Sequence, residues 1–191
     1  MNKITLLDKS FKTYIPYEKV MEVIDNVAEK VNSDYRGCED VPVLLCVMNG
    51  SLMFTAEIMK RLDFNCELAS MKLTSYDGLH STGKIKIIQP LSTDVKGKRV
   101  IIVEDIVDTG HTIVALSKYL NECGASDIKV CTLFHKPEAY EYKDVMPIDY
   151  IAMNIQNQFI VGFGLDYNNL GRQYKDIYIL DEQNDKSEQD K

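Results

Sequence analysis

Cysteines are few in this chain of 191 residues, and their spacing excludes two common uses of them. No two of the five have the separation of a zinc knuckle or of a redox pair, and an odd number does not favour a disulfide framework. Reduced cysteines are typical of cytoplasmic proteins. We therefore expect a cytoplasmic protein with mostly buried free thiols at Cys38, Cys46, Cys66, Cys123 and Cys131.

Positive charge is also scarce. The chain has 22 lysine and arginine residues against 29 aspartate and glutamate residues, a net charge of −7 at pH 7. This balance argues against nucleic acid or an anionic membrane as a general partner. It leaves room for a small phosphorylated ligand, because such a site is built locally from backbone dipoles, magnesium and a few cations.

Long apolar stretches and common nucleotide-binding fingerprints are missing as well. No apolar run approaches the ~20 residues of a membrane span, and the N-terminus has no charged-then-apolar leader. The sequence contains no GxGxxG, no GxxxxGK[ST] and no internal repeat. These absences exclude the dinucleotide-binding fingerprint, the P-loop and a repeat architecture.

What is present is a core and a regular order of elements. Apolar residues make up 45% of the chain. Strands alternate with helical patterns, which predicts an α/β fold with a mostly parallel five-stranded sheet flanked by helices. One domain, residues 1–180, is expected to precede a disordered acidic tail, residues 181–191, which has no apolar residue. The expected strands are 43–48, 65–73, 99–103, 128–134 and 150–153, and the expected helices are 17–32, 52–61 and 112–123.

The most informative stretch covers residues 99–112. Four aliphatic residues lead to adjacent carboxylates, Glu104 and Asp105, and then to a glycine turn that opens a helix. Strand ends of open α/β sheets are where ligands bind, and backbone N–H groups at a helix start attract anions. Paired carboxylates beside an anion site favour a sugar diol or a magnesium ion next to a phosphate. For the two carboxylates alone, the alternative is an acidic loop that caps an ordinary strand–helix unit.

Three further segments are candidates for binding. Asn49-Gly50-Ser51, between a predicted strand and a predicted helix, is a second possible anion site. Residues 74–84 are polar and contain two glycines; they form either a solvated hairpin loop or a lid that returns through a strand at 85–88. Lys136 follows the strand at 128–134, and on its own it is most simply a solvated lysine.

Residues 99–112 closely resemble the phosphoribosyl-pyrophosphate signature of the type I phosphoribosyltransferases, in the form of the hypoxanthine-guanine members. Residues 159–167, with Arg172 shortly after, resemble the family's second signature. The resemblance implies the type I phosphoribosyltransferase fold, with a small cap, or hood, formed by the N-terminal residues and about 154–180. The implied reaction transfers the phosphoribosyl group to a 6-oxopurine, hypoxanthine or guanine, giving IMP or GMP and pyrophosphate with magnesium as cofactor.

The resemblance also implies roles for individual residues. Asp108 is the candidate general base at N7 of the purine. The ribose hydroxyls are assigned to Glu104 and Asp105. Pyrophosphate is assigned to Asn49, Gly50 and Arg172, with a cis peptide at Met48–Asn49. Magnesium is assigned to Glu104, Asp105 and Asp166. The 5′-phosphate is assigned to the turn formed by Asp108, Thr109, Gly110, His111 and Thr112.

The purine site and the lid complete these assignments. Ser75 and Tyr76 are expected to open the mobile lid over the reaction. Two positions depart from the family pattern, because many relatives carry lysine or arginine where this chain has Asn49, and often an arginine where it has Ala139 or Tyr140. The purine is assigned to Lys136, which donates to O6, Phe159, which stacks, Ile160, which offers backbone groups, and Asp166.

Alternatives of other classes are weaker. Transfer to xanthine or to a pyrimidine changes the base alone, and Lys136 with residues 159–166 favours 6-oxopurines. A non-enzymatic regulator that senses phosphoribosyl pyrophosphate needs a basic nucleic-acid face, which this chain lacks. A metal-dependent phosphatase or receiver-like domain needs an acidic cluster on its first strand, which is missing. We expect a homodimer or homotetramer with small-molecule substrates, and neither nucleic acid nor membrane as partner.

Overall fold

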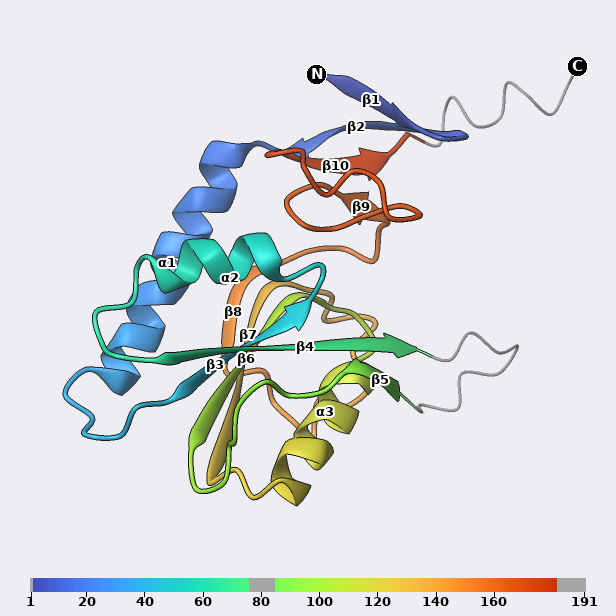
Figure 1. Ribbon diagram of the computed structural model, residues 1–191. Helices are drawn as coiled ribbons and strands as arrows, with labels where there is room; N and C mark the ends of the chain where they lie inside the picture. The colour runs from blue at the N-terminus through green and yellow to red at the C-terminus, as the bar shows by residue number, and fades with distance from the viewer. Residues whose placement is uncertain (1, 76–84, 182–191) are drawn as a thin grey trace, which may run out of the picture.

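The computed structural model describes residues 2–75 and 85–181. Within them, a sheet of six strands has the order β5-β4-β3-β6-β7-β8 (Figure 1). Five of these strands pair in parallel, which confirms the predicted sheet. The sixth, β5, runs antiparallel to β4 where the return strand of the lid was expected. The bounds are β3 Val43–Met48, β4 Glu67–Ser75, β5 Ile85–Gln89, β6 Arg99–Val107, β7 Asp127–His135 and β8 Tyr150–Asn154.

Both faces of this sheet are covered, because successive residues of a strand point to opposite sides. Leu44 of β3 packs in one apolar cluster with α1 (Tyr17–Tyr35) and α2 (Leu52–Met59). Its neighbour Val43 packs in a second cluster with α3 (His111–Glu122). In Figure 1, α1 lies at the left of the sheet, α2 lies above it and α3 lies below it. Burial on both faces explains why these strands are continuous aliphatic runs in the sequence.

A second, smaller sheet joins the two ends of the chain and lies at the top of Figure 1. Its strands pair antiparallel in the order β1-β2-β10-β9. Their bounds are β1 Lys3–Leu6, β2 Lys9–Ile15, β9 Ile160–Val161 and β10 Ile177–Leu180. A third apolar cluster, which includes Phe11 and Tyr178, packs within it. We call residues 2–15 and 159–181 the hood; it is the cap that the family resemblance implied.

The C-terminal end of the hood is ordered one residue further than the sequence predicted. Asp181, expected to begin a disordered tail, is buried instead. Its carboxylate forms ion pairs with Lys3 Nζ at 2.8 Å and with Lys12 Nζ at 3.4 Å, because β10 runs beside the N-terminal strands. The rest of the expected tail, residues 182–191, lies outside the described residues.

The three helices differ slightly from their predicted bounds, and α3 begins and ends one residue earlier than predicted. α1 continues to Tyr35, because Tyr35 is buried and its ring stacks on Phe64 with centroids 5.2 Å apart. α2 ends at Met59, two residues before the expected end, because the Arg61 N–H donates to the Ile58 carbonyl three residues back. Such a bond tightens the last turn and ends the α-helix.

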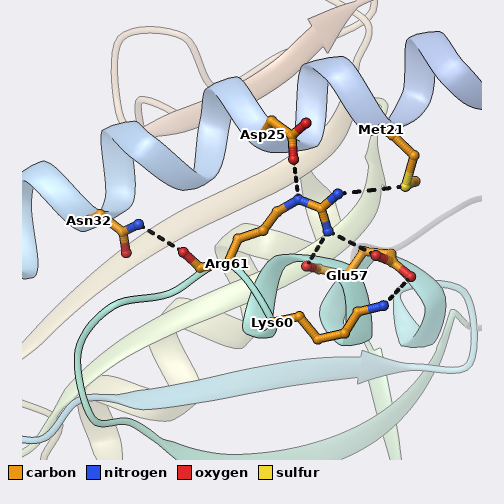
Figure 2. Close-up of polar contacts among 6 residues, drawn as sticks. All are labelled: Met21, Asp25, Asn32, Glu57, Lys60 and Arg61. Atoms are coloured by element: carbon orange, nitrogen blue, oxygen red, sulfur yellow. Dashed lines mark hydrogen bonds and ion pairs between the residues drawn. The ribbon is translucent and has the colours of Figure 1, made fainter.

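The side chain of Arg61 joins α1 to α2, as Figure 2 shows. Its guanidinium forms an ion pair with Asp25 of α1 and a second one with Glu57 of α2 at 2.8 Å. The side-chain amide of Asn32 donates to the Arg61 carbonyl at 2.9 Å. Half-exposed ion pairs contribute little singly, but this network fixes α2, and α2 begins directly after Gly50 and Ser51.

The described helices include none that is long and apolar enough to cross a membrane. All five cysteines are free thiols. Cys46 and Cys131 are buried and Cys38 is exposed.

Candidate functional site

A cavity of about 270 Å³ lies at the carboxyl ends of β3 and β6. The two strands are neighbours in the sheet, so the turns that follow them meet at one edge. This cavity brings together the two anion sites that the sequence suggested separately. Its wall includes Gly50 from the first turn, Glu104 and Asp105 from β6, and Asp108, Thr109, Gly110 and Thr112 from the second turn.

Glu104 and Asp105 lie inside β6, whereas the sequence placed them after the strand. β6 continues to Val107 because its pairing with β7 extends to Val107 opposite His135. Both carboxylates are therefore buried, each with a relative exposure of 8%. Glu104 Oε2 has no hydrogen-bond partner among the described residues.

Burial sets the acidity of this pair. It raises the pKa of Glu104 well above the ordinary value, and the neighbouring Asp105 carboxyl raises it further. It also raises the pKa of Asp105, against the opposing effect of hydrogen bonds to Glu104 and to the Ile106 N–H. A cation would favour the ionised form of both groups, so the pair suits a metal ion or the hydroxyls of a sugar.

The turn that opens α3 offers backbone donors to the cavity. Gly110 is the N-cap residue, with φ of 92°, and no side chain caps the helix there. The first N–H groups of a helix lack internal partners and carry about half a positive charge, so this turn can bind an anion. His111 does not line the cavity: its Nδ1 lies 2.8 Å from Thr109 Oγ1 and its Nε2 lies 3.6 Å from the Glu141 carboxylate.

Asp108 and Lys136 contact each other. The family resemblance implied the first as a general base and the second as a donor to the purine. Lys136 Nζ lies 2.7 Å from Asp108 Oδ2. The lysine is buried, whereas the side chain of Asp108 is 45% exposed. The Lys136 N–H donates to the Val107 carbonyl at 3.0 Å, so the start of the loop after β7 is held against the end of β6.

The first turn approaches the carboxylates closely. The peptide bond between Met48 and Asn49 is cis, as the resemblance implied. A Cβ built on Gly50 would lie 1.7 Å from Asp105 Oδ2, so only glycine fits here. Asn49 is not among the described residues that line the cavity.

A loop of the hood covers this first turn. A Cβ built on Gly164 would lie 2.0 Å from the Gly50 carbonyl oxygen. Arg172 donates to the Gly164 carbonyl at 2.6 Å and forms an ion pair with Asp166 at 2.6 Å. Arg172 also lowers the pKa of Asp105, an effect smaller than that of burial. Arg172 and Asp166, predicted for pyrophosphate and for magnesium or purine, thus pair with each other near Gly50.

The remaining predicted residues lie outside this cavity. Phe159 is 47% exposed, with its ring 6.2 Å from that of Phe11, and Ile160 is buried in β9. A second cavity of about 670 Å³ lies between the hood and the loops after β7 and β8; its wall includes Pro137, next to Lys136, and Gln158, next to Phe159. Ser75 is the last residue of β4, and Tyr76 lies outside the described residues.

The candidate metal ligands in this site are carboxylates alone. Across residues 2–75 and 85–181, no three side chains of histidine, cysteine, aspartate or glutamate gather as a complete metal site. Mg²⁺ usually uses one or two carboxylates together with substrate phosphates, so a complete protein cage is not required. The unpartnered Oε2 of buried Glu104 is consistent with such a ligand.

Some features of the site were not predictable from residue patterns. The contact of Asp108 with Lys136 joins residues 28 positions apart, and the packing of Tyr140 against Gly110 joins different loops. The departure from the family pattern at Tyr140 indicated only a missing cation near pyrophosphate, and no sequence signal pointed to its packing against Gly110.

Comparisons with known proteins agree with this geometry. A family model described as phosphoribosyl transferase domain matches residues 13–168. The chain is 35% identical to a hypoxanthine-guanine phosphoribosyltransferase of Streptococcus thermophilus over 180 residues, which cover 93% of this chain and 98% of that protein. It is 40% identical to a protein of the same name from Streptococcus pyogenes serotype M3 over 158 residues, covering 82% and 86%. A crystal structure of a hypoxanthine phosphoribosyltransferase from Staphylococcus aureus matches with a TM-score of 0.83 at 29% identity, covering 90% of this chain and 92% of that one.

Proposed function

The chain belongs to the phosphoribosyltransferase family, and on this basis we propose that it is a purine salvage enzyme. It transfers the phosphoribosyl group of phosphoribosyl pyrophosphate to hypoxanthine or guanine, and it releases pyrophosphate. The observation that carries this proposal is the contact of Asp108 with Lys136 beside the turn that opens α3.

That contact matches the edge of a 6-oxopurine. Such a base presents O6, an acceptor, next to N7, which carries a proton in one tautomer of the free base. Lys136 Nζ donates to O6 while Asp108 accepts the proton from N7. The two protein atoms are 2.7 Å apart, so both can reach neighbouring atoms of one ring system. Adenine has an amino group at position 6, which would leave the lysine without an acceptor, so it should be rejected.

The phosphoribosyl group is held by the turn and the carboxylates. The N–H groups and hydroxyls of residues 108–112 bind the 5′-phosphate, and no lysine is needed because the helix start attracts the anion. Glu104 and Asp105 accept hydrogen bonds from the ribose hydroxyls. Gly50 places backbone next to Asp105, on the side where pyrophosphate leaves.

Catalysis consists mainly of positioning and charge. The bond from C1′ to N9 of the purine forms as the bond from C1′ to the pyrophosphate oxygen breaks, and Asp108 takes the N7 proton. Positive character develops at C1′, near the carboxylates of Glu104 and Asp105, which can stabilise it. Arg172 meets the leaving pyrophosphate after exchanging its contact with Asp166 for the ligand. Phe159 stacks on the purine and Ile160 offers backbone groups to its edge.

Magnesium fits the carboxylates of this site. Glu104, Asp105 and Asp166 would hold it together with the substrate's oxygens, and when bound it would offset the charge of the leaving pyrophosphate. The fit rests on the buried, unpartnered Oε2 of Glu104.

We also propose that the enzyme acts in the cytoplasm as a homodimer or homotetramer. A groove of about 340 Å³ runs between α2 and β4, and Leu52, Met59 and Leu68 in its wall are more than a third exposed. Exposed apolar side chains gathered in one place are typical of an interface. Light scattering of the wild type and of Leu68→Lys tests this: a smaller particle for the variant is expected, and a monomeric wild type would refute it.

The direct test of function is an absorbance assay with phosphoribosyl pyrophosphate and Mg²⁺ in which each base is offered in turn. Conversion of hypoxanthine and guanine is expected, without measurable conversion of adenine or uracil. Preference for xanthine or a pyrimidine would correct the base specificity, and conversion of none would refute the proposal.

A further inference from the structure

Tyr140 lies directly behind the turn that opens α3. Among the described residues, those lining the 270 Å³ cavity include Gly110 but not Tyr140. A Cβ built on Gly110 would lie 2.3 Å from Tyr140 Cε2 and 2.8 Å from Cδ2. The backbone of Gly110 therefore rests on the face or edge of this ring, with the cavity on its other side. A side chain at position 110 would collide with the ring, and the φ of 92° also favours glycine there.

The ring of Tyr140 has little freedom to move. Its relative exposure is 5%, and its hydroxyl donates to the Met146 carbonyl. The ring packs edge to face against His135, with centroids 5.3 Å apart, and against Tyr142 at 6.4 Å. Tyr142 in turn packs edge to face on His111, the first residue of α3, at 5.4 Å. Aromatic rings held in this way form a rigid support.

Backbone hydrogen bonds tie the same segment to both halves of the site. The Tyr140 N–H donates to the Lys136 carbonyl at 3.1 Å, which closes a turn after the purine-binding lysine. The next residue, Glu141, donates its N–H to the Thr109 carbonyl at 3.1 Å, inside the phosphate turn. A shift of Tyr140 would therefore reach Thr109 and Gly110 directly.

We propose that Tyr140 is a positioning residue for the 5′-phosphate. Its ring fixes Gly110, and so fixes the direction of the N–H groups that bind the anion, without touching the substrate. The identity of the ligand rests on the proposed function, whereas the support of the turn rests on the packing alone. Loss of the ring leaves a space behind Gly110 into which the turn can relax, and the loss of a hydrogen bond to a charged group lowers affinity by roughly tenfold or more.

The experiment compares Tyr140→Ala and Tyr140→Phe with a matched control, Tyr150→Ala. Tyr150 is equally buried, and its hydroxyl donates to Asp34 at 2.7 Å, but it begins β8 and lies outside the site. The dissociation constants of IMP and of inosine are measured for each variant, because the ratio of the two isolates the contribution of the phosphate. The KM for phosphoribosyl pyrophosphate, kcat and the melting temperature are measured alongside.

For Tyr140→Ala, we expect the dissociation constant of IMP and the KM for phosphoribosyl pyrophosphate to rise about tenfold or more, with inosine affinity nearly unchanged. Tyr140→Phe keeps the ring and should bind IMP as the wild type does. Tyr150→Ala should have a lower melting temperature than the wild type, with the same ratio of IMP affinity to inosine affinity. If Tyr140→Ala does not fold, Tyr140→Leu, which keeps bulk without a flat ring, serves the same comparison.

Two results would overturn the role of Tyr140. One is an equal loss of affinity for IMP and inosine in Tyr140→Ala, and the other is an unchanged affinity of Tyr140→Ala for IMP while the wild type binds IMP more tightly than inosine. A wild-type protein that binds neither ligand would instead refute the proposed function, so the two failures are distinguishable.

Discussion

The phosphate half of the site and its purine and pyrophosphate half are held by different means. The first consists of residues 104–112, which are contiguous in the chain and are proposed to bind the ligand through backbone N–H groups and two buried carboxylates on β6. The second consists of side chains that come from separate places, such as Lys136 after β7 and Arg172 in the hood. In this half each cation is paired with a carboxylate: Lys136 with Asp108 of the phosphate half, and Arg172 with Asp166 of the hood.

Because of this difference, the two halves should respond to different kinds of substitution. The phosphate half carries its donors on the backbone, so it depends on what packs behind the turn, such as Tyr140. The second half must exchange contacts between protein charges for contacts to the ligand, so it depends on the identity of each side chain. Substitutions should therefore affect kcat, base binding and pyrophosphate binding separately.

Asp108→Asn should have the largest effect. Asparagine keeps the shape of the side chain but cannot take a proton, and general base catalysis typically contributes on the order of 10²–10⁴-fold. We expect kcat to fall by about that factor with little change in the KM for phosphoribosyl pyrophosphate. Steady-state kinetics measures this, with the exposed Asp144→Asn as control. Turnover at the wild-type rate would remove Asp108 from the mechanism.

Lys136→Ala should weaken the binding of the purine and leave the binding of phosphoribosyl pyrophosphate unchanged. Hydrogen bonds to charged groups contribute about 1.5–3 kcal/mol, which corresponds to a rise of roughly 10–10²-fold in the KM for hypoxanthine. The KM for phosphoribosyl pyrophosphate should stay close to that of the wild type, because the phosphate turn is held by backbone bonds. Lys143→Ala, at an exposed position, is the control. Equal weakening of both substrates would argue against a role in reading the base.

Arg172→Gln should weaken the binding of the pyrophosphate group and leave the binding of the rest of the ligand unchanged. We expect the KM for phosphoribosyl pyrophosphate to rise about tenfold, as for one charged hydrogen bond. The dissociation constant of IMP, which has no pyrophosphate, should change little. A loss of IMP affinity as large as the rise in KM would show that Arg172 acts by holding the hood loop at Gly164, and not by contacting pyrophosphate.

Glu104→Gln should have the smallest effect, and it should be stabilising. The folded-state pKa of Glu104 is raised above 4.5, so the wild type is favoured below this value and loses stability as the pH rises through the folded pKa. In the absence of metal, the free energy of unfolding of the variant should therefore exceed that of the wild type by on the order of 1 kcal/mol at pH 8, and the difference should shrink towards pH 4. Denaturant unfolding in EDTA at several pH values measures it; a gain that is larger at low pH would contradict the account.

Sequence reasoning predicted the phosphate half better than the other half, for a physical reason. Residues 99–112 form one strand, one turn and one helix start, so local pattern determines their arrangement. The burial of Glu104 and Asp105 within β6 was missed, because it depends on how far β7 continues alongside. The partners of Lys136 and Arg172 were also missed, because they depend on contacts between segments that are distant in the chain.

The hood shows the same limit. The cap implied by the resemblance is present, but the ion pairs of Asp181 with Lys3 and Lys12 join residues more than 160 positions apart. Composition alone assigned Asp181 to a tail, because a segment without apolar residues cannot form a core of its own. The pairing of β10 beside β2 supplies the partners that composition does not reveal.

The most direct test of the central claim is a crystal structure of the protein with IMP. We predict that the phosphate lies within hydrogen-bonding distance of the N–H groups of residues 109–112 and that O6 and N7 of the purine face Lys136 and Asp108. An IMP molecule bound elsewhere, with no phosphate at the start of α3, would contradict it.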